Sequence, residues 1–212
     1  CRYLLFRSVG LLAVYLTPIY ILLFWLAEPL VGFVYGERWL ESANVISVIC
    51  LAWPALLIDN MAGAALGAKN WLHYELPVQL GALGLTAVAV YFGQTYGIAG
   101  VAAAIVTVFY LSAAVMFWLA ARCLEARFKE LVTALKPALL LNLPLILVSG
   151  GVYHLQTRAQ ASLSLGDAVL LGALSSVFYV GCFLLAPIDA LASERMRYRE
   201  WTLNLMRRVS RG

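Results

Sequence analysis

The sequence predicts an all-α integral membrane protein with about six transmembrane helices. Of its 212 residues, 63% are hydrophobic and only 12% are charged, and the mean hydropathy is +0.87. Soluble globular proteins carry about 25% charged residues. The apolar residues fall into long blocks, close to the roughly 20 residues that a helix needs to cross a bilayer core of about 30 Å. Barrel strands would be about ten residues long and would alternate polar with apolar side chains, unlike these blocks.

Six apolar blocks are expected to span the membrane. They cover about residues 9–35, 43–68, 76–92, 98–121, 138–154 and 168–187. Residues 1–8 then form a cytoplasmic N-terminal segment, and residues 188–212 form a basic, amphipathic cytoplasmic tail. The sequence starts at Cys1, and its first block lacks a short apolar core with a cleavage site. We therefore expect no signal peptide and a chain that belongs to a longer protein.

The positions of the basic residues predict an orientation. If the spans alternate in direction, only Arg38 and Arg158 of the 15 Lys and Arg residues lie on one side. Cytoplasmic loops of membrane proteins carry an excess of Lys and Arg. We therefore expect both ends of the chain to be cytoplasmic. The same topology accounts for the net charge of +4, so we expect no nucleic-acid partner. The other thirteen basic residues are Arg2, Arg7, Lys69, Arg122, Arg127, Lys129, Lys136, Arg195, Arg197, Arg199, Arg207, Arg208 and Arg211.

Polar side chains within the first two blocks are the main candidates for function. Pro18 is expected to kink the first block, whose Trp25 and Tyr35 suit an interfacial aromatic belt. In the second block, Asp59 and Asn60 follow Pro54. A charge deep in a bilayer costs at least about 2.5 to 3.5 kcal/mol and normally faces a partner or a water-filled cavity. The alternative is that Asp59 lies near the cytoplasmic end and pairs with Lys69 or His73.

Small residues predict close packing of the second, third and fourth spans. Gly63 and Gly67 have a GxxxG spacing, which allows a neighbouring helix to approach closely. Further small residues are expected to extend the same surface in the next two spans: Gly81, Gly84, Gly100 and Ala104.

The later part of the chain offers fewer polar groups. Between the fourth and fifth spans, four apolar residues recur at intervals of four, three and four, which predicts a helix on the cytoplasmic surface: Leu124, Phe128, Leu131 and Leu135. Pro137 is then expected to begin the fifth span, Pro144 to break it, and Asn142 is its only strongly polar residue.

The sequence shows no catalytic, metal or cofactor motif. It contains no GxxxxGK[ST], HExxH or GxSxG pattern, and its four cysteines form no CxxC pair. We therefore predict that the chain is not an enzyme and holds no cofactor or metal. The polar residues in or near the spans suit a cavity that binds a polar head group, with the two arginines at its cytoplasmic mouth: Asp59, Asn60, Tyr15, Tyr20, Asn142, Arg2 and Arg7.

Residues 29–124 resemble the C-terminal polysaccharide-biosynthesis domain of bacterial lipid-linked oligosaccharide flippases. One span ends in a Leu-Gly-basic turn at Leu66, Gly67 and Lys69. The next span leads into a GxxGVA turn formed by Gly97, Gly100, Val101 and Ala102. Upstream, the run PLVGFVYGERWLESANVI looks like the family's pattern of Pro, then Tyr/Phe-Gly-x-x-Trp, then Ala, which precedes a span.

The resemblance implies the C-terminal part of a two-bundle exporter fold in a bacterial inner membrane. Such a protein moves a polyprenyl-pyrophosphate-linked oligosaccharide to the outer leaflet for O-antigen or exopolysaccharide synthesis. We expect an ion or membrane-potential gradient, rather than ATP, to drive this step. The implied partners are the lipid bilayer, the glycan lipid, an N-terminal bundle and other polysaccharide-assembly membrane proteins. Cavities in this family are generally cationic, whereas the deepest charge here is Asp59. The alternatives are an ion-coupled drug or cation exporter of the same superfamily and a membrane glycan polymerase or ligase.

Overall fold

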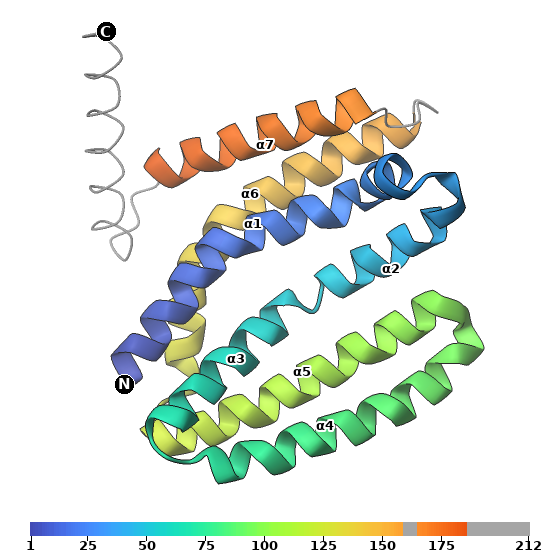
Figure 1. The fold of residues 1–212 in the computed structure, drawn as a ribbon. Helices are drawn as coiled ribbons and strands as arrows, with labels where there is room; N and C mark the ends of the chain where they lie inside the picture. Colours follow the sequence, from blue (N-terminus) through green and yellow to red (C-terminus); the bar gives the residue numbers. More distant parts are fainter. Residues whose placement is uncertain (159–164, 186–212) are drawn as a thin grey trace, which may run out of the picture.

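The computed structural model describes residues 1–158 and 165–185, and every element in these two ranges is helical (Figure 1). The all-α prediction is therefore confirmed for the described residues. The predicted tail, 188–212, lies outside them. In chain order the elements are α1 (Arg2–Tyr35), η1 (Glu37–Trp39), α2 (Leu40–Cys50), α3 (Trp53–Ala68), α4 (Leu72–Gly93), η2 (Gln94–Tyr96), α5 (Gly97–Leu124), α6 (Phe128–Arg158) and α7 (Leu165–Leu185).

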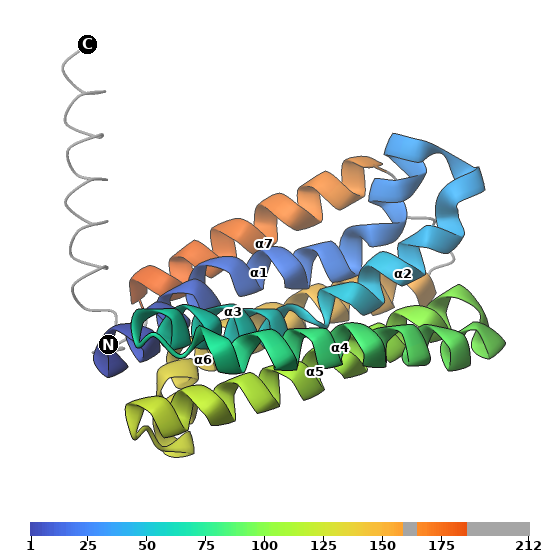
Figure 2. The same ribbon diagram turned by 60° about the horizontal axis from the view of Figure 1, so that its bottom comes forward.

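The lengths of these helices are consistent with a membrane protein. Three described helical segments are long and apolar enough to cross a bilayer, and a fourth results if α2 and α3, bent by 49°, form one broken span. One of the three, Leu72–Leu124, contains both α4 and α5. The chain doubles back at η2, where Gly97 has a φ of 75°, and α4 packs along α5 (Figures 1 and 2). The count of six spans stays a prediction.

The helices form two packing groups. Helices α1, α6 and α7 contact one another, and their buried cluster includes Val14, Leu141 and Phe183. Helices α3, α4 and α5 form the other group (Figure 1). Leu66 and Met116 are fully buried within it. Helix α2 packs on α1 and α5, so it lies between the groups.

The structure corrects the prediction for the segment before the fifth span. Residues from Phe128 onward are helical, as the spacing indicates, but they are the first turns of α6 rather than a separate surface helix. Leu131 is buried against α1, whereas Phe128 is 66% exposed, so only part of this apolar face packs on protein. The connection from α5 is a short turn in which Glu125 has a φ of 52°.

Helix α6 also continues through Pro144, where the sequence predicts a break. Proline removes one backbone donor, but neighbouring helices allow membrane helices to tolerate this loss. Helix α1 is likewise continuous through Pro18 and Pro29.

The small residues do not form one shared packing surface. A Cβ added at Gly81 or Gly84 would meet no atom of the described residues within 4 Å, so these two glycines do not pack on the described helices, contrary to the prediction. The close approach of α4 and α5 lies instead at Gly93 and Gly100, where a Cβ on Gly100 would come within 2.6 Å of the Gly93 carbonyl oxygen. The remaining predicted positions differ in surroundings: Gly63 lies against the Glu75 carboxylate, Gly67 against Leu72, and Ala104 is half-buried.

This contrast predicts different effects for two identical substitutions. Gly100→Ala is expected to lower the free energy of unfolding by about 1 to 3 kcal/mol, because the added methyl group overpacks a backbone contact. Gly81→Ala is the matched control, and it is expected to be neutral or slightly stabilising because alanine favours the helix. Denaturant titration of both variants in detergent measures the difference. Equal effects of the two substitutions would contradict the assignment of the close contact to Gly100.

Candidate functional site

The helix that carries Asp59 is interrupted where α2 ends and α3 begins. Leu51 and Ala52 separate the two helices, and Pro54 has no N–H to donate to the carbonyl of Cys50. The carbonyl oxygen of Leu51 accepts a hydrogen bond from the Tyr110 hydroxyl of α5 at 2.8 Å. Irregular backbone at membrane depth occurs where it is buried in protein or lines a cavity. The interruption therefore marks this part of the chain as a candidate site.

A cavity of about 390 Å³ lies beside this interruption. Its walls come from both packing groups, because the lining residues belong to α1, α3, α5 and α6 together with the end of α2. The lining is mostly apolar and rich in aromatic side chains, and the described residues that form it include no Asp, Glu, Lys or Arg. The aromatic members are Tyr20, Phe24, Trp25, Trp53 and Tyr110.

Trp53 organises the aromatic wall of this cavity. Its ring stacks on Tyr20 with a centroid distance of 4.4 Å and an interplanar angle of 10°. Its indole N–H donates to the Thr17 hydroxyl at 3.2 Å. Trp53 is the first residue of α3, whereas Tyr20 and Thr17 belong to α1, so these contacts join the interruption to the other packing group.

Asn142 provides the most buried polar side chain of the lining. Its residue surface is only 3% exposed. The amide nitrogen donates to the carbonyl oxygen of Ala138 at 2.8 Å, one helical turn earlier. The amide oxygen has no hydrogen-bond partner among the described residues. The predicted cavity residues Tyr20 and Asn142 are therefore brought to the same cavity.

Asp59 lies elsewhere, between α3 and the α4–α5 pair. One carboxylate oxygen accepts a hydrogen bond from the Ser112 hydroxyl at 2.9 Å, and the other accepts one from the Gln79 amide at 3.2 Å. The partners are thus Ser112 and Gln79, and not Lys69 or His73, which were the alternative. Asp59 is half-buried, and its contacts link three helices.

Asn60 does not share this environment. Its side chain is exposed and donates to the Leu56 carbonyl of its own helix at 2.7 Å. Asp59 and Asn60 are adjacent in sequence, but the structure gives them different partners.

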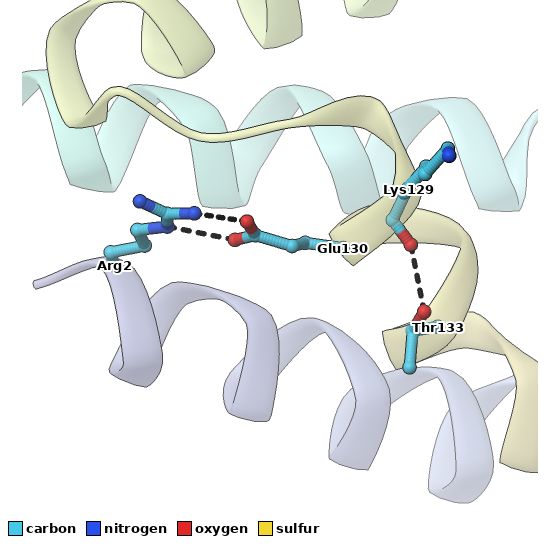
Figure 3. A network of polar contacts seen from close by, with 4 residues as sticks. All are labelled: Arg2, Lys129, Glu130 and Thr133. Atoms are coloured by element: carbon cyan, nitrogen blue, oxygen red, sulfur yellow. Dashed lines mark hydrogen bonds and ion pairs between the residues drawn. The ribbon is translucent and has the colours of Figure 1, made fainter.

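Arg2 and Arg7 lie near the start of α1, outside the lining of the cavity. Arg2 forms a two-point ion pair with Glu130 of α6, next to the hydrogen bond from Thr133 to the Lys129 carbonyl (Figure 3). Arg7 donates to the Tyr3 hydroxyl at 3.1 Å.

Tyr15 is also separate from the cavity. It lies with its ring centroid 6.2 Å from that of Phe183 on α7. A shared role of Arg2, Arg7 and Tyr15 with the cavity residues stays a prediction.

Sequence reasoning missed most of the cavity wall. Trp25 was expected in an interfacial belt, yet it lines the cavity. Trp53 and Tyr110 were not singled out, and the only local signal of the interruption was Pro54, which follows Trp53. Ser112 and Gln79 give no such signal, because only the packing of three helices brings them to Asp59.

Comparisons with family models, curated proteins and solved structures find no significant match. Among the described residues, no group of three or more His, Cys, Asp or Glu side chains is placed to hold a metal ion. The cavity and the Asp59 contacts are therefore the two features on which a function can be argued.

Proposed function

We propose that the chain is part of a membrane transporter that moves a polyprenyl-pyrophosphate-linked oligosaccharide across a bacterial inner membrane by alternating access. The observation that carries this proposal is the cavity of about 390 Å³ between two helix groups, beside an interrupted helix. Transporters commonly build their substrate and ion sites from interrupted helices near the bilayer midplane. Here both helix groups belong to this chain, and the second bundle of the exporter is the proposed partner. The sequence resemblance supplies the substrate class and the partner bundle.

The cavity and Asp59 have separate roles in this proposal. The uncharged cavity contacts the apolar and neutral parts of the cargo, and the pyrophosphate is held by cationic groups outside it, on the partner bundle or at Arg2 and Arg7. Asp59 couples transport to an ion, because a carboxylate between helices can gain and lose a cation as the helices move. Its hydrogen bonds to α4 and α5 support this role, since they connect its charge state to the packing of both helices.

One observation favours a second function. The aromatic, uncharged lining of the cavity suits an amphipathic drug better than a pyrophosphate. An ion-coupled drug or cation exporter of the same superfamily is therefore the alternative cargo assignment.

Disruption of the encoding gene in its own cells tests the proposal. We expect surface polysaccharide to be lost and the lipid-linked oligosaccharide to accumulate in the inner leaflet, and a plasmid copy of the gene is expected to reverse both effects. Gel staining of surface glycans and leaflet-selective labelling of the lipid intermediate measure this. Normal surface glycan with increased sensitivity to cationic drugs would support the exporter instead. Shortened glycan chains without accumulation of the intermediate would indicate a polymerase.

A further inference from the structure

We infer that the hydroxyl of Tyr179 on α7 acts as a latch on α1. It bonds the Val14 carbonyl that Pro18 leaves without a backbone donor, and its release allows α1 to bend at Pro18 and to open the cavity. The inference goes beyond the proposed function, because it describes a movement of α1 that requires no particular cargo.

Pro18 leaves a gap in the hydrogen bonds of α1. In a regular helix, the N–H of residue 18 would donate to the carbonyl of Val14, four residues earlier. Proline has no N–H, and its ring clashes with that carbonyl. Val14 is fully buried and Pro18 is also buried, so bulk water does not reach the carbonyl. A buried carbonyl without a partner would destabilise this part of α1.

Tyr179 supplies the missing donor from another helix. Its hydroxyl donates to the Val14 carbonyl, and its side chain belongs to the same buried cluster as Val14. Neighbouring helices restore lost hydrogen bonds at prolines of membrane helices in this way. The bond therefore completes the hydrogen bonding of α1 at Pro18.

Asn142 of α6 also contacts the Tyr179 hydroxyl. The residue is 3% exposed, and its side chain forms a hydrogen-bond contact with that hydroxyl. An amide group has two N–H hydrogens, so it can serve Tyr179 in addition to the Ala138 carbonyl. Three helices, α1, α6 and α7, thus meet at one hydroxyl group. A shift of α7 away from α1 breaks the bond to Val14 and leaves the turn at Pro18 without its donor.

A bend at Pro18 would act on the cavity because α1 forms one of its walls. Thr17 and Tyr20 stand on either side of Pro18, and both line the cavity. Both also contact Trp53 of α3. Sharp helix kinks occur at prolines, where the backbone bond that resists bending is missing. Bending therefore moves Tyr20 relative to Val14, which remains in the core with α6 and α7.

The rate at which N-ethylmaleimide labels Cys50 tests the inference in the full 212-residue chain in lipid nanodiscs. Cys50 is a free, buried cysteine that lines the cavity, so its labelling requires the cavity to open. We expect Tyr179→Phe to raise this rate about fivefold, the factor that corresponds to one neutral hydrogen bond. Mass spectrometry of peptides measures Cys123 separately. That cysteine packs in the other helix group, and its rate is expected not to change.

Pro18→Ala identifies the atom through which Tyr179 acts. Alanine restores the N–H that donates to the Val14 carbonyl, so the hydroxyl is no longer needed there. With Pro18→Ala present, we expect Tyr179→Phe to change the labelling rate of Cys50 by less than about twofold, because two groups that serve one acceptor do not act additively. Tyr91→Phe is the matched control. It removes a hydroxyl from an exposed position on α4 and is expected to leave the rate unchanged.

Three results would overturn the inference. An unchanged rate at Cys50 in Tyr179→Phe would show that the hydroxyl does not hold α1. An equal increase with and without Pro18→Ala would show that Tyr179 acts through packing rather than through the carbonyl. An equal increase at Cys50 and Cys123 would show a general loss of stability. If Tyr179→Phe alone does not fold, the double variant decides: recovery of folding by Pro18→Ala supports the inference, and no recovery rejects it.

Discussion

Trp53→Ala is expected to lower the free energy of unfolding by about 3 kcal/mol. This value is the lower end of the range for replacing a buried tryptophan by alanine, because one side of Trp53 already borders the cavity. The substitution removes the stack on Tyr20 and the hydrogen bond to Thr17, which connect α3 to α1. Denaturant titration of the purified chain in detergent measures the change.

Trp39→Ala is the matched control for this prediction. Trp39 ends η1 and is 57% exposed, so its removal is expected to change stability by less than about 0.5 kcal/mol, as at most surface positions. If both tryptophan variants lost the same stability, the contacts of Trp53 with α1 would not be the cause.

Asp59→Asn is expected to reduce glycan export in the complete transporter by at least about tenfold while leaving the protein level unchanged. The neutral amide no longer attracts the coupling ion, and each 1.4 kcal/mol of lost interaction corresponds to a factor of about ten. Asparagine keeps an oxygen for Ser112, and the Gln79 amide can turn to accept from the new NH₂ group. Folding is therefore preserved, whereas the site for an ion is lost. The rate at which surface polysaccharide reappears after induction measures export.

Ser112→Ala separates ion coupling from helix packing. It removes one hydrogen bond to Asp59 but keeps the carboxylate. We expect export to fall only in proportion to the amount of folded protein. If Asp59→Asn exported normally, Asp59 would be a structural residue that links α3 to α4 and α5.

The helix boundaries followed closely from the sequence where a hydrophobic block ends in a polar turn. The expected ends at Tyr35 and Ala68 agree with the ends of α1 and α3. The interruption at Leu51 and Ala52 was not predicted, because both residues are apolar and the hydropathy of the block does not change there. Pro54 was the only local signal, yet Pro18 and Pro144 lie inside continuous helices. At the break near Pro54, the Leu51 carbonyl accepts a hydrogen bond from the Tyr110 hydroxyl, a tertiary contact that the sequence does not reveal.

The candidate site was less predictable than the helices. The search for polar residues in apolar blocks found Tyr20 and Asn142, which line the cavity, and Asp59, which does not. Polarity alone does not give the direction in which a side chain points, and a cavity lined mainly by apolar residues offers few polar positions to find. The packing role expected of Gly81 and Gly84 failed for a related reason, because a membrane helix that is apolar on all sides has no periodicity to show which face meets protein.

The interruption after Cys50 also forms a joint between α2 and α3. Helices α2 and α3 both pack on α1 and α5, but α2 makes its most extensive contacts with α1 and α3 makes its own with α5. Rotation about Leu51 and Ala52 would move the two helices relative to each other without bending a regular helix. The cavity lies at this joint, so we expect its volume to depend on the angle between α2 and α3, which is 49° in this structure.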